Sequence, residues 1–101
     1  MNDDVESGGD MIRSWLDDRF PEADVRKVEP DPSGQYHRWL VDFGDGDLGV
    51  GATRRVLQNR DALRDRIQEV ERGTWLEDLE GSHKRFVLGT DAIFPRDRGT
   101  W

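Results

Sequence analysis

The first apolar pattern along the chain predicts a helix from Asp10 to Phe20. Asp10 offers a side-chain oxygen that can cap the first turn, and Pro21 ends the helix because the residue before a proline avoids the α region. Residues 1–9 are acidic, end in two glycines and hold one isolated valine, so they are predicted to form a disordered tail. The apolar residues of the helix recur at helical spacing: Met11, Ile12, Trp15, Leu16 and Phe20.

The next stretch follows the two-residue period of strands. A weak pattern at 24–29 predicts an edge strand, and the segment 30–34, rich in proline and glycine, predicts a turn. A Gly-Asp-Gly-Asp sequence at 44–47 predicts a tight hairpin that leads into a returning strand over 48–52. Residues 36–43 alternate most clearly, and one face of that strand consists of His37, Trp39, Val41 and Phe43.

The second half of the chain predicts one main helix. It begins at Arg54, capped by Thr53, or only after Asp61, and Gly73 closes it. A capping-box spacing then predicts a short second helix over 74–79. The narrow apolar stripe of the main helix consists of Val56, Leu63, Ile67 and Val70.

The resulting order of elements, α-β-β-β-α-β, predicts an α+β fold. Residues 84–89 form the last predicted strand, and 92–94 are expected to extend it after a bend. We expect one domain over 10–94, with a mainly antiparallel sheet packed against the helices, followed by a polar C-terminal tail over 95–101. The predicted centre of the core consists of Trp39, Val41, Phe43, Leu63, Ile67 and Trp15.

Length and composition narrow the classes of function. A chain of 101 residues has the size of one domain and is too short for a two-domain cofactor enzyme or a barrel enzyme. No apolar run approaches the roughly 18 residues that span a membrane, and no signal peptide is expected. The absence of cysteine excludes disulfides, thiolate catalysis and cysteine-held metals, and two histidines exclude a three-histidine metal site. No cofactor is expected.

The apolar content predicts a folded domain with a thin core. Leu, Ile, Val and Phe together number 23 of 101 residues, and four tryptophans add large apolar area. A core of this size leaves little stability to spare. Burial against a protein partner, or against a second copy in a homodimer, is expected to supply the remaining stabilisation.

The balance of charged residue types indicates the solvent. Asp and Glu total 22 against 15 Lys and Arg, a net charge of −7, and 15 of the acids are Asp while only two of the bases are Lys. Short carboxylates hold water without exposing apolar stems, whereas lysine brings a long stem to the surface. In composition, over its whole length, the chain resembles cytosolic proteins of halophilic archaea. The resemblance carries no motif, so it implies a salt-rich cytoplasm and not a function.

One segment carries the pattern of an anion site. Glycines let main-chain N–H groups approach a ligand, a helix N-terminus attracts anions, and two arginines can clamp one. No dinucleotide or P-loop motif is completed, because Arg54 replaces the third glycine and no Gly-Lys-Ser/Thr follows. The alternative is an ordinary strand in which the glycines make room for neighbouring side chains, followed by a threonine that caps the next helix. The candidate anion- or nucleic-acid-binding residues are Gly49, Gly51, Thr53, Arg54 and Arg55.

No set of residues predicts catalysis or a metal site. His37 lies on the apolar face of a strand, where a hydrogen-bonded histidine at the margin of the core is the simpler interpretation, and His83 follows a turn. Asp42, Asp45 and Asp47 are spaced like calcium ligands, but the full twelve-residue loop with its final Glu is missing. The protein is therefore not expected to be an enzyme, and an enzyme that uses His37 with a carboxylate is the third alternative.

The arginines of residues 54–72 do not form a nucleic-acid stripe. Six Arg against four acids give this segment a net charge of +2, but at 100° per residue the arginines spread around the whole helix. This arrangement favours a surface helix with internal salt bridges. The expected function is a non-enzymatic protein-interaction or regulatory module of a halophilic cytoplasm. The alternative is a nucleic-acid or small-anion binder using Gly49–Arg55, with Tyr36 or a tryptophan stacking on single strands.

Overall fold

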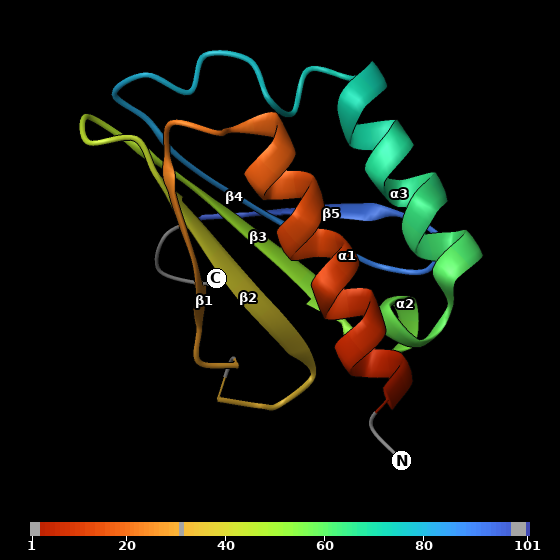
Figure 1. Ribbon diagram of the computed structural model, residues 1–101. Helices are drawn as coiled ribbons and strands as arrows, with labels where there is room; N and C mark the ends of the chain where they lie inside the picture. Colours follow the sequence, from red (N-terminus) through yellow and green to blue (C-terminus); the bar gives the residue numbers. More distant parts are fainter. Residues whose placement is uncertain (1–2, 31, 98–100) are drawn as a thin grey trace.

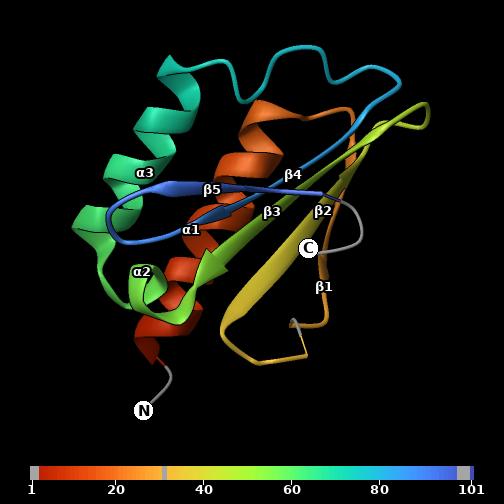
Figure 2. The ribbon, with the colours of Figure 1, turned by 180° about the vertical axis from the view of Figure 1, so that it is seen from behind.

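A five-stranded sheet forms the centre of the structure, and helices lie on one of its two faces (Figures 1 and 2). The computed structural model describes residues 3–30, 32–97 and 101, and within them it confirms one small α+β domain with the predicted order of elements. Neighbouring strands follow one another in the sequence. They are β1 (Asp24–Val28), β2 (Tyr36–Asp42), β3 (Asp47–Thr53), β4 (His83–Leu88) and β5 (Ile93–Arg96).

The sheet is mixed, although the sequence predicted a mainly antiparallel one. Strands β3 and β4 pair in parallel, while the other three neighbouring pairs are antiparallel. The helices between β3 and β4 carry the chain back across the sheet, as a parallel pair requires. At the other end, β4 and β5 are two antiparallel strands joined by a turn closed by Gly89 N and Ala92 O at 2.8 Å. Residues 93–96 therefore form a separate strand, which reaches into the predicted tail.

The first helix, α1 (Asp3–Arg19), begins seven residues before the predicted start at Asp10. Val5 is buried, and Gly8 lies so close to Leu57 that an added Cβ would stand 2.3 Å from the Leu57 main-chain oxygen. The apolar face of α1 thus extends past Gly8 to Val5. Because Gly8 has no side chain, the apolar pattern of the sequence does not show this extension. Residues 1–2 of the predicted disordered tail lie outside the described residues, whereas residues 3–9 are helical.

The predicted main helix is two helices, α2 (Arg54–Gln58) and α3 (Arg60–Arg72). Thr53 caps α2 as predicted, because its Oγ1 accepts from Val56 N at 3.2 Å, and Asn59 caps α3 through Ala62 N at 3.1 Å. Residues 74–79 do not form the predicted short helix. Asp78 has a φ of 54°, outside the right-handed helical region, and three side chains of this irregular segment pack against the core: Trp75, Leu76 and Leu79.

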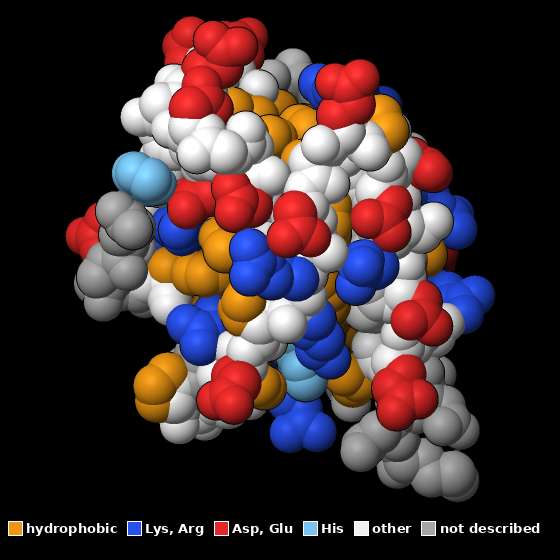
Figure 3. All heavy atoms as spheres, turned by 60° about the vertical axis from the view of Figure 1, so that its left-hand side comes forward, with side chains coloured by type: hydrophobic (Ala, Val, Ile, Leu, Met, Phe, Trp, Pro, Cys, Tyr) orange, Lys and Arg blue, Asp and Glu red, His pale blue; other side chains and the backbone are white. Residues whose placement is uncertain are grey.

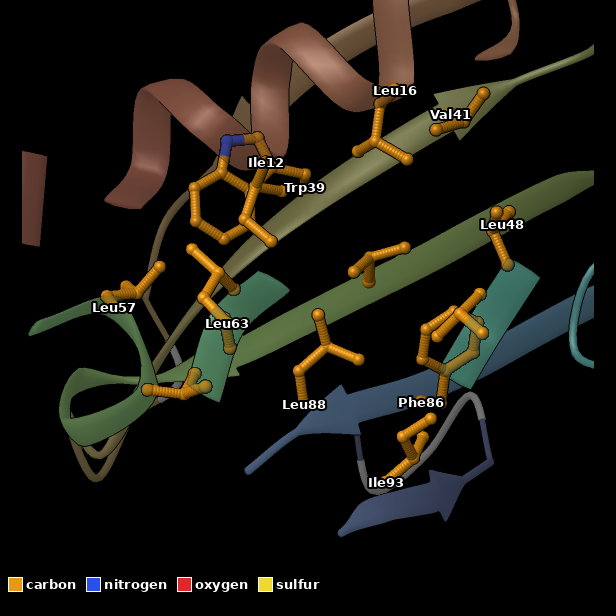
Figure 4. Close-up of a cluster of buried hydrophobic side chains, with 14 of the residues drawn as sticks. Ile12, Leu16, Trp39, Val41, Leu48, Leu57, Leu63, Phe86, Leu88 and Ile93 are labelled. Atoms are coloured by element: carbon orange, nitrogen blue, oxygen red, sulfur yellow. The ribbon is translucent and has the colours of Figure 1, made fainter. Parts of the chain in front are cut away.

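The hydrophobic core lies between the helices and the sheet (Figure 4). Of the predicted core residues, Trp39, Val41 and Leu63 are buried, while Phe43, Ile67 and Trp15 are only partly buried at its margin. None of the described helices is long and apolar enough to cross a membrane.

Candidate functional site: the open face of the sheet

Figure 2 views the sheet from the side opposite the helices. The outward side chains of this face form rows across the strands, and three of these rows matter for the site. Residues paired across strands share a face, so the register assigns each row. The acidic row consists of Asp24, Asp42, Asp47 and His83. The arginine row consists of Arg26, Leu40, Gly49, Arg85 and Arg96. The apolar row consists of Val28, Arg38, Gly51, Val87 and Phe94.

The acidic row neutralises part of the arginine row. Arg85 is only 8% exposed, and its Nη1 lies 2.6 Å from Asp47 Oδ1. Burial raises the pKa of Asp47, but hydrogen bonds from Arg85 and His83 outweigh burial and hold this pKa below its usual value. Arg26 makes longer contacts of 3.3 Å with both Asp24 and Asp42. Two of the arginines on this face are therefore already paired with carboxylates.

The indole of Trp101 lies on this face between two guanidinium groups. The guanidinium carbons of Arg38 and Arg85 stand 5.1 and 4.9 Å from the Trp101 ring centroid, within cation–π range. Arg38 Nη1 also donates to the Trp101 main-chain oxygen at 2.6 Å. An added Cβ on Gly49 would stand 2.9 Å from Trp101 Cε2. We call this position, bounded by Arg38, Gly49 and Arg85, the tryptophan slot, and Figure 2 shows the chain end on this side.

Arg38 is held in place from the main chain. Its Nε donates to the Glu29 main-chain oxygen at 2.9 Å and its Nη2 to that of Pro30 at 3.2 Å. Among the described residues, no Asp or Glu side chain forms an ion pair with Arg38. Its guanidinium is instead engaged by three main-chain oxygens and by the Trp101 ring.

The five residues predicted to bind an anion are divided between two surroundings. Gly49 and Gly51 face outward on β3 under neighbouring side chains, and a Cβ on Gly51 would stand 3.0 Å from both Tyr36 Cδ2 and Val87 Cγ2. Thr53 caps α2, where Arg54 and Arg55 are exposed. This placement favours the alternative in which the glycines make room for side chains. Anion binding by these residues stays a prediction.

The histidines and aspartates considered in the sequence analysis are placed as follows. His37 is half-buried on the helix side of β2, and burial, then Lys27, then Arg54 lower its pKa. His83 Nδ1 lies 3.0 Å from Asp47 Oδ1, and Asp42 Oδ1 accepts from Gly44 N at 2.8 Å within the hairpin. Among the described residues, no cluster of three or more His, Cys, Asp or Glu side chains is arranged to hold a metal ion.

Of the residues of the tryptophan slot, the sequence analysis named only Gly49 as a candidate, and it missed Arg38, Arg85 and Trp101. The alternation of β2 assigned Arg38 to the face opposite Trp39, and this was the one available signal for its position. Trp101 follows a polar stretch, and nothing in its neighbourhood indicates that it returns to the sheet.

No protein-family model, no curated protein and no solved structure matches this chain.

Proposed function

We propose that the protein is a non-enzymatic protein-interaction module whose tryptophan slot binds an aromatic side chain of a partner protein. One observation carries the proposal: the slot already holds an aromatic residue, Trp101, between Arg38 and Arg85. Guanidinium groups stack on aromatic rings, and Arg38 adds a hydrogen bond to a main-chain oxygen. An extended peptide segment with one aromatic residue offers both groups.

The charge pattern of the face supports a protein occupant over a nucleic acid. Arg26 and Arg85 are paired with aspartates, and the acidic row beside them would repel phosphates. A second copy of the chain carries the same aromatic segment. If the slot of each copy binds Trp101 of the other copy, the same interaction produces a homodimer.

The proposed setting is the cytoplasm of a halophile. The support is the composition, with 15 Asp and only two Lys, because short carboxylates suit a salt-rich solvent. Stacking in a partly buried slot is screened less by salt than a contact between exposed charges. An aromatic slot is thus a mode of recognition that persists in such a solvent.

The second candidate function is binding of single-stranded nucleic acid on the same face. The observation that favours it is Phe94, which is 45% exposed and lies in the same row as Arg38. Exposed aromatic rings beside arginines stack on bases with little sequence preference. This candidate extends the predicted use of Gly49–Arg55, since Gly49 lies next to Arg85 and Trp101, and Gly51 next to Tyr36 and Val87, on the same face.

A peptide titration tests the proposed function. The probe is a synthetic peptide with the sequence of residues 95–101, and the protein is the full-length Trp101→Ala variant, in which the slot is vacant. We expect the peptide to bind this variant at least about tenfold more tightly than the parent, whose slot is filled, as expected when one hot-spot side chain is displaced. The same peptide with Ala in place of Trp is the control ligand.

A pair of arginine variants separates the slot from the general charge of the face. Adding Arg38→Gln to the Trp101→Ala variant should abolish the gain in peptide affinity. Adding Arg26→Gln removes the same charge from the same face and should leave that gain unchanged. Equal peptide binding by the parent and Trp101→Ala would contradict the proposal. Binding of a labelled single-stranded oligonucleotide without binding of the peptide would favour the second candidate.

A further inference from the structure

We propose that a cavity between α1 and the strands β1 and β2, on the helix side of the sheet, binds a small zwitterion with a short apolar side chain, as in a free apolar amino acid. The cavity has a volume of about 230 Å³, below the roughly 300–1,000 Å³ that encloses a drug-sized ligand. Val5, Trp39 and Leu57 form an apolar floor, and all three are buried. This site does not involve the open face and stands independently of the proposed function.

The charged residues around the cavity carry both signs. Arg13 and Lys27 supply cations, and Glu6 and Asp10 supply carboxylates. Arg13 pairs with Asp17 at 3.3 Å, whereas Glu6, Asp10 and Lys27 make no ion pair within the described part of the chain. Figure 3 views this side of the molecule and shows Lys and Arg side chains interspersed with Asp and Glu side chains. Two cations and two carboxylates complement a zwitterion better than a simple anion.

His37 contributes a buried polar atom that lacks a partner. Its Nδ1 is inaccessible to solvent and makes no hydrogen bond to any described residue. Burial, and then the charges of Lys27 and Arg54, lower the pKa of His37, so the imidazole is neutral near pH 7 and its Nδ1 can donate or accept one hydrogen bond. An unpaired buried polar atom costs stability, and a ligand group in the cavity would recover that hydrogen bond.

Two adjacent glycines of α1 give independent support. An added Cβ on Gly8 would collide with the main chain of Leu57, so packing requires Gly8. An added Cβ on Gly9 would meet only the Trp39 indole, at an ordinary contact distance of 3.4 Å. Glycine inside a helix is less stable than alanine. Packing does not require Gly9, and its effect is to keep the cavity open at this point.

Ligand binding can be followed through the NMR signals of the His37 ring in the full-length protein. The probes are L-leucine, 4-methylpentanoate, which lacks the ammonium group, and isoamylamine, which lacks the carboxylate. We expect leucine to shift the His37 signals saturably at about 1–10 mM, the range of a millimolar Kd. Each truncated probe should bind at least about tenfold more weakly, the effect of losing one charge-assisted hydrogen bond.

Variants locate the site. Leucine affinity should fall from the parent to Gly9→Ala and again to Gly9→Val, as added methyl groups fill the cavity while the thermal midpoint reports that each variant folds. Lys27→Gln should weaken binding, and Lys84→Gln, which removes the chain's other lysine, should leave it unchanged. The proposal is overturned if leucine leaves the His37 signals unmoved, if 4-methylpentanoate binds as tightly as leucine, or if Gly9→Val binds like the parent.

Discussion

At the residue scale, Trp39 tests which face of β2 forms the core. It is 2% exposed, is the largest of the fully buried side chains, and packs between α1 and the sheet (Figure 4). Trp39→Ala should lower the free energy of unfolding by about 3–5 kcal/mol, the range for truncating a buried large aromatic. Chemical denaturation measures this. Phe94→Ala, which removes an exposed aromatic ring, is the matched control, and a Trp39→Ala variant as stable as that control would contradict the assigned face.

His37 makes stability depend on pH in a defined direction. Its pKa in the folded protein lies below the unfolded value of 6.5, so the unfolded state binds the proton more tightly. The stabilisation is therefore complete above pH 6.5 and is lost as the pH falls from 6.5 toward the lower folded pKa. Thermal midpoints measured across this range should fall more steeply with acid for the parent than for His37→Gln. Identical slopes would show that His37 does not carry the effect.

The residue types along the sequence predict some of the observed contacts but give no indication of others. The Thr53 cap follows from a short hydroxyl side chain at the start of a helical pattern, and the structure confirms it. The stacking of Trp101 on Arg38 could not be predicted, because it joins residues 63 positions apart and no periodic sequence pattern precedes Trp101. Local chemistry predicts local contacts, whereas long-range contacts depend on the path of the whole chain.

At the element scale, the sequence predicted the positions of most helices and strands but not all of their bounds. The start of α1 was missed because Gly8 and Gly9 interrupt the apolar stripe, although the helix continues through them. The parallel pairing of β3 and β4 was missed because strand direction depends on the crossing helices and not on alternation within either strand.

The contrast between Gly8 and Gly9 gives a prediction for α1. Gly8→Ala should lower the free energy of unfolding by about 1–3 kcal/mol, because its Cβ would overlap the main chain of Leu57. Gly9→Ala should raise it by roughly 0.5–1 kcal/mol, since alanine is the better helix former and finds only an ordinary contact. Denaturant unfolding of the two variants measures the difference. Equal effects would contradict the close approach of α1 to α2.

At the scale of the whole molecule, the acidic surface should make stability rise with salt. The Debye length falls from about 30 Å at 0.01 M to about 3 Å at 1 M, and the longest extent of the molecule is 38 Å. Repulsion among carboxylates is therefore screened in molar KCl, while close pairs such as Arg85 and Asp47 persist. We expect the thermal midpoint to rise steadily from about 0.1 to about 2 M KCl.

Point variants are the appropriate control for this salt effect. Deleting the acidic N-terminal segment would also remove Val5 from the core. Neutralising three exposed acids of α1 instead, by Glu6→Gln, Asp10→Asn and Asp18→Asn, should reduce the gain in midpoint with KCl. A midpoint that stays flat or falls as KCl rises would remove the support for a halophilic setting.

The central claim is that the open face binds an aromatic peptide segment in a salt-rich solvent. The most direct test measures the affinity of the 95–101 peptide and of a single-stranded oligonucleotide for Trp101→Ala, from about 0.2 to about 2 M KCl. Aromatic burial is not weakened by salt, so peptide affinity should change by less than about threefold. Oligonucleotide affinity should fall by roughly 0.7 decades per phosphate contact for each decade of salt. Loss of peptide binding in molar KCl, or an oligonucleotide that binds more tightly than the peptide there, would contradict the account.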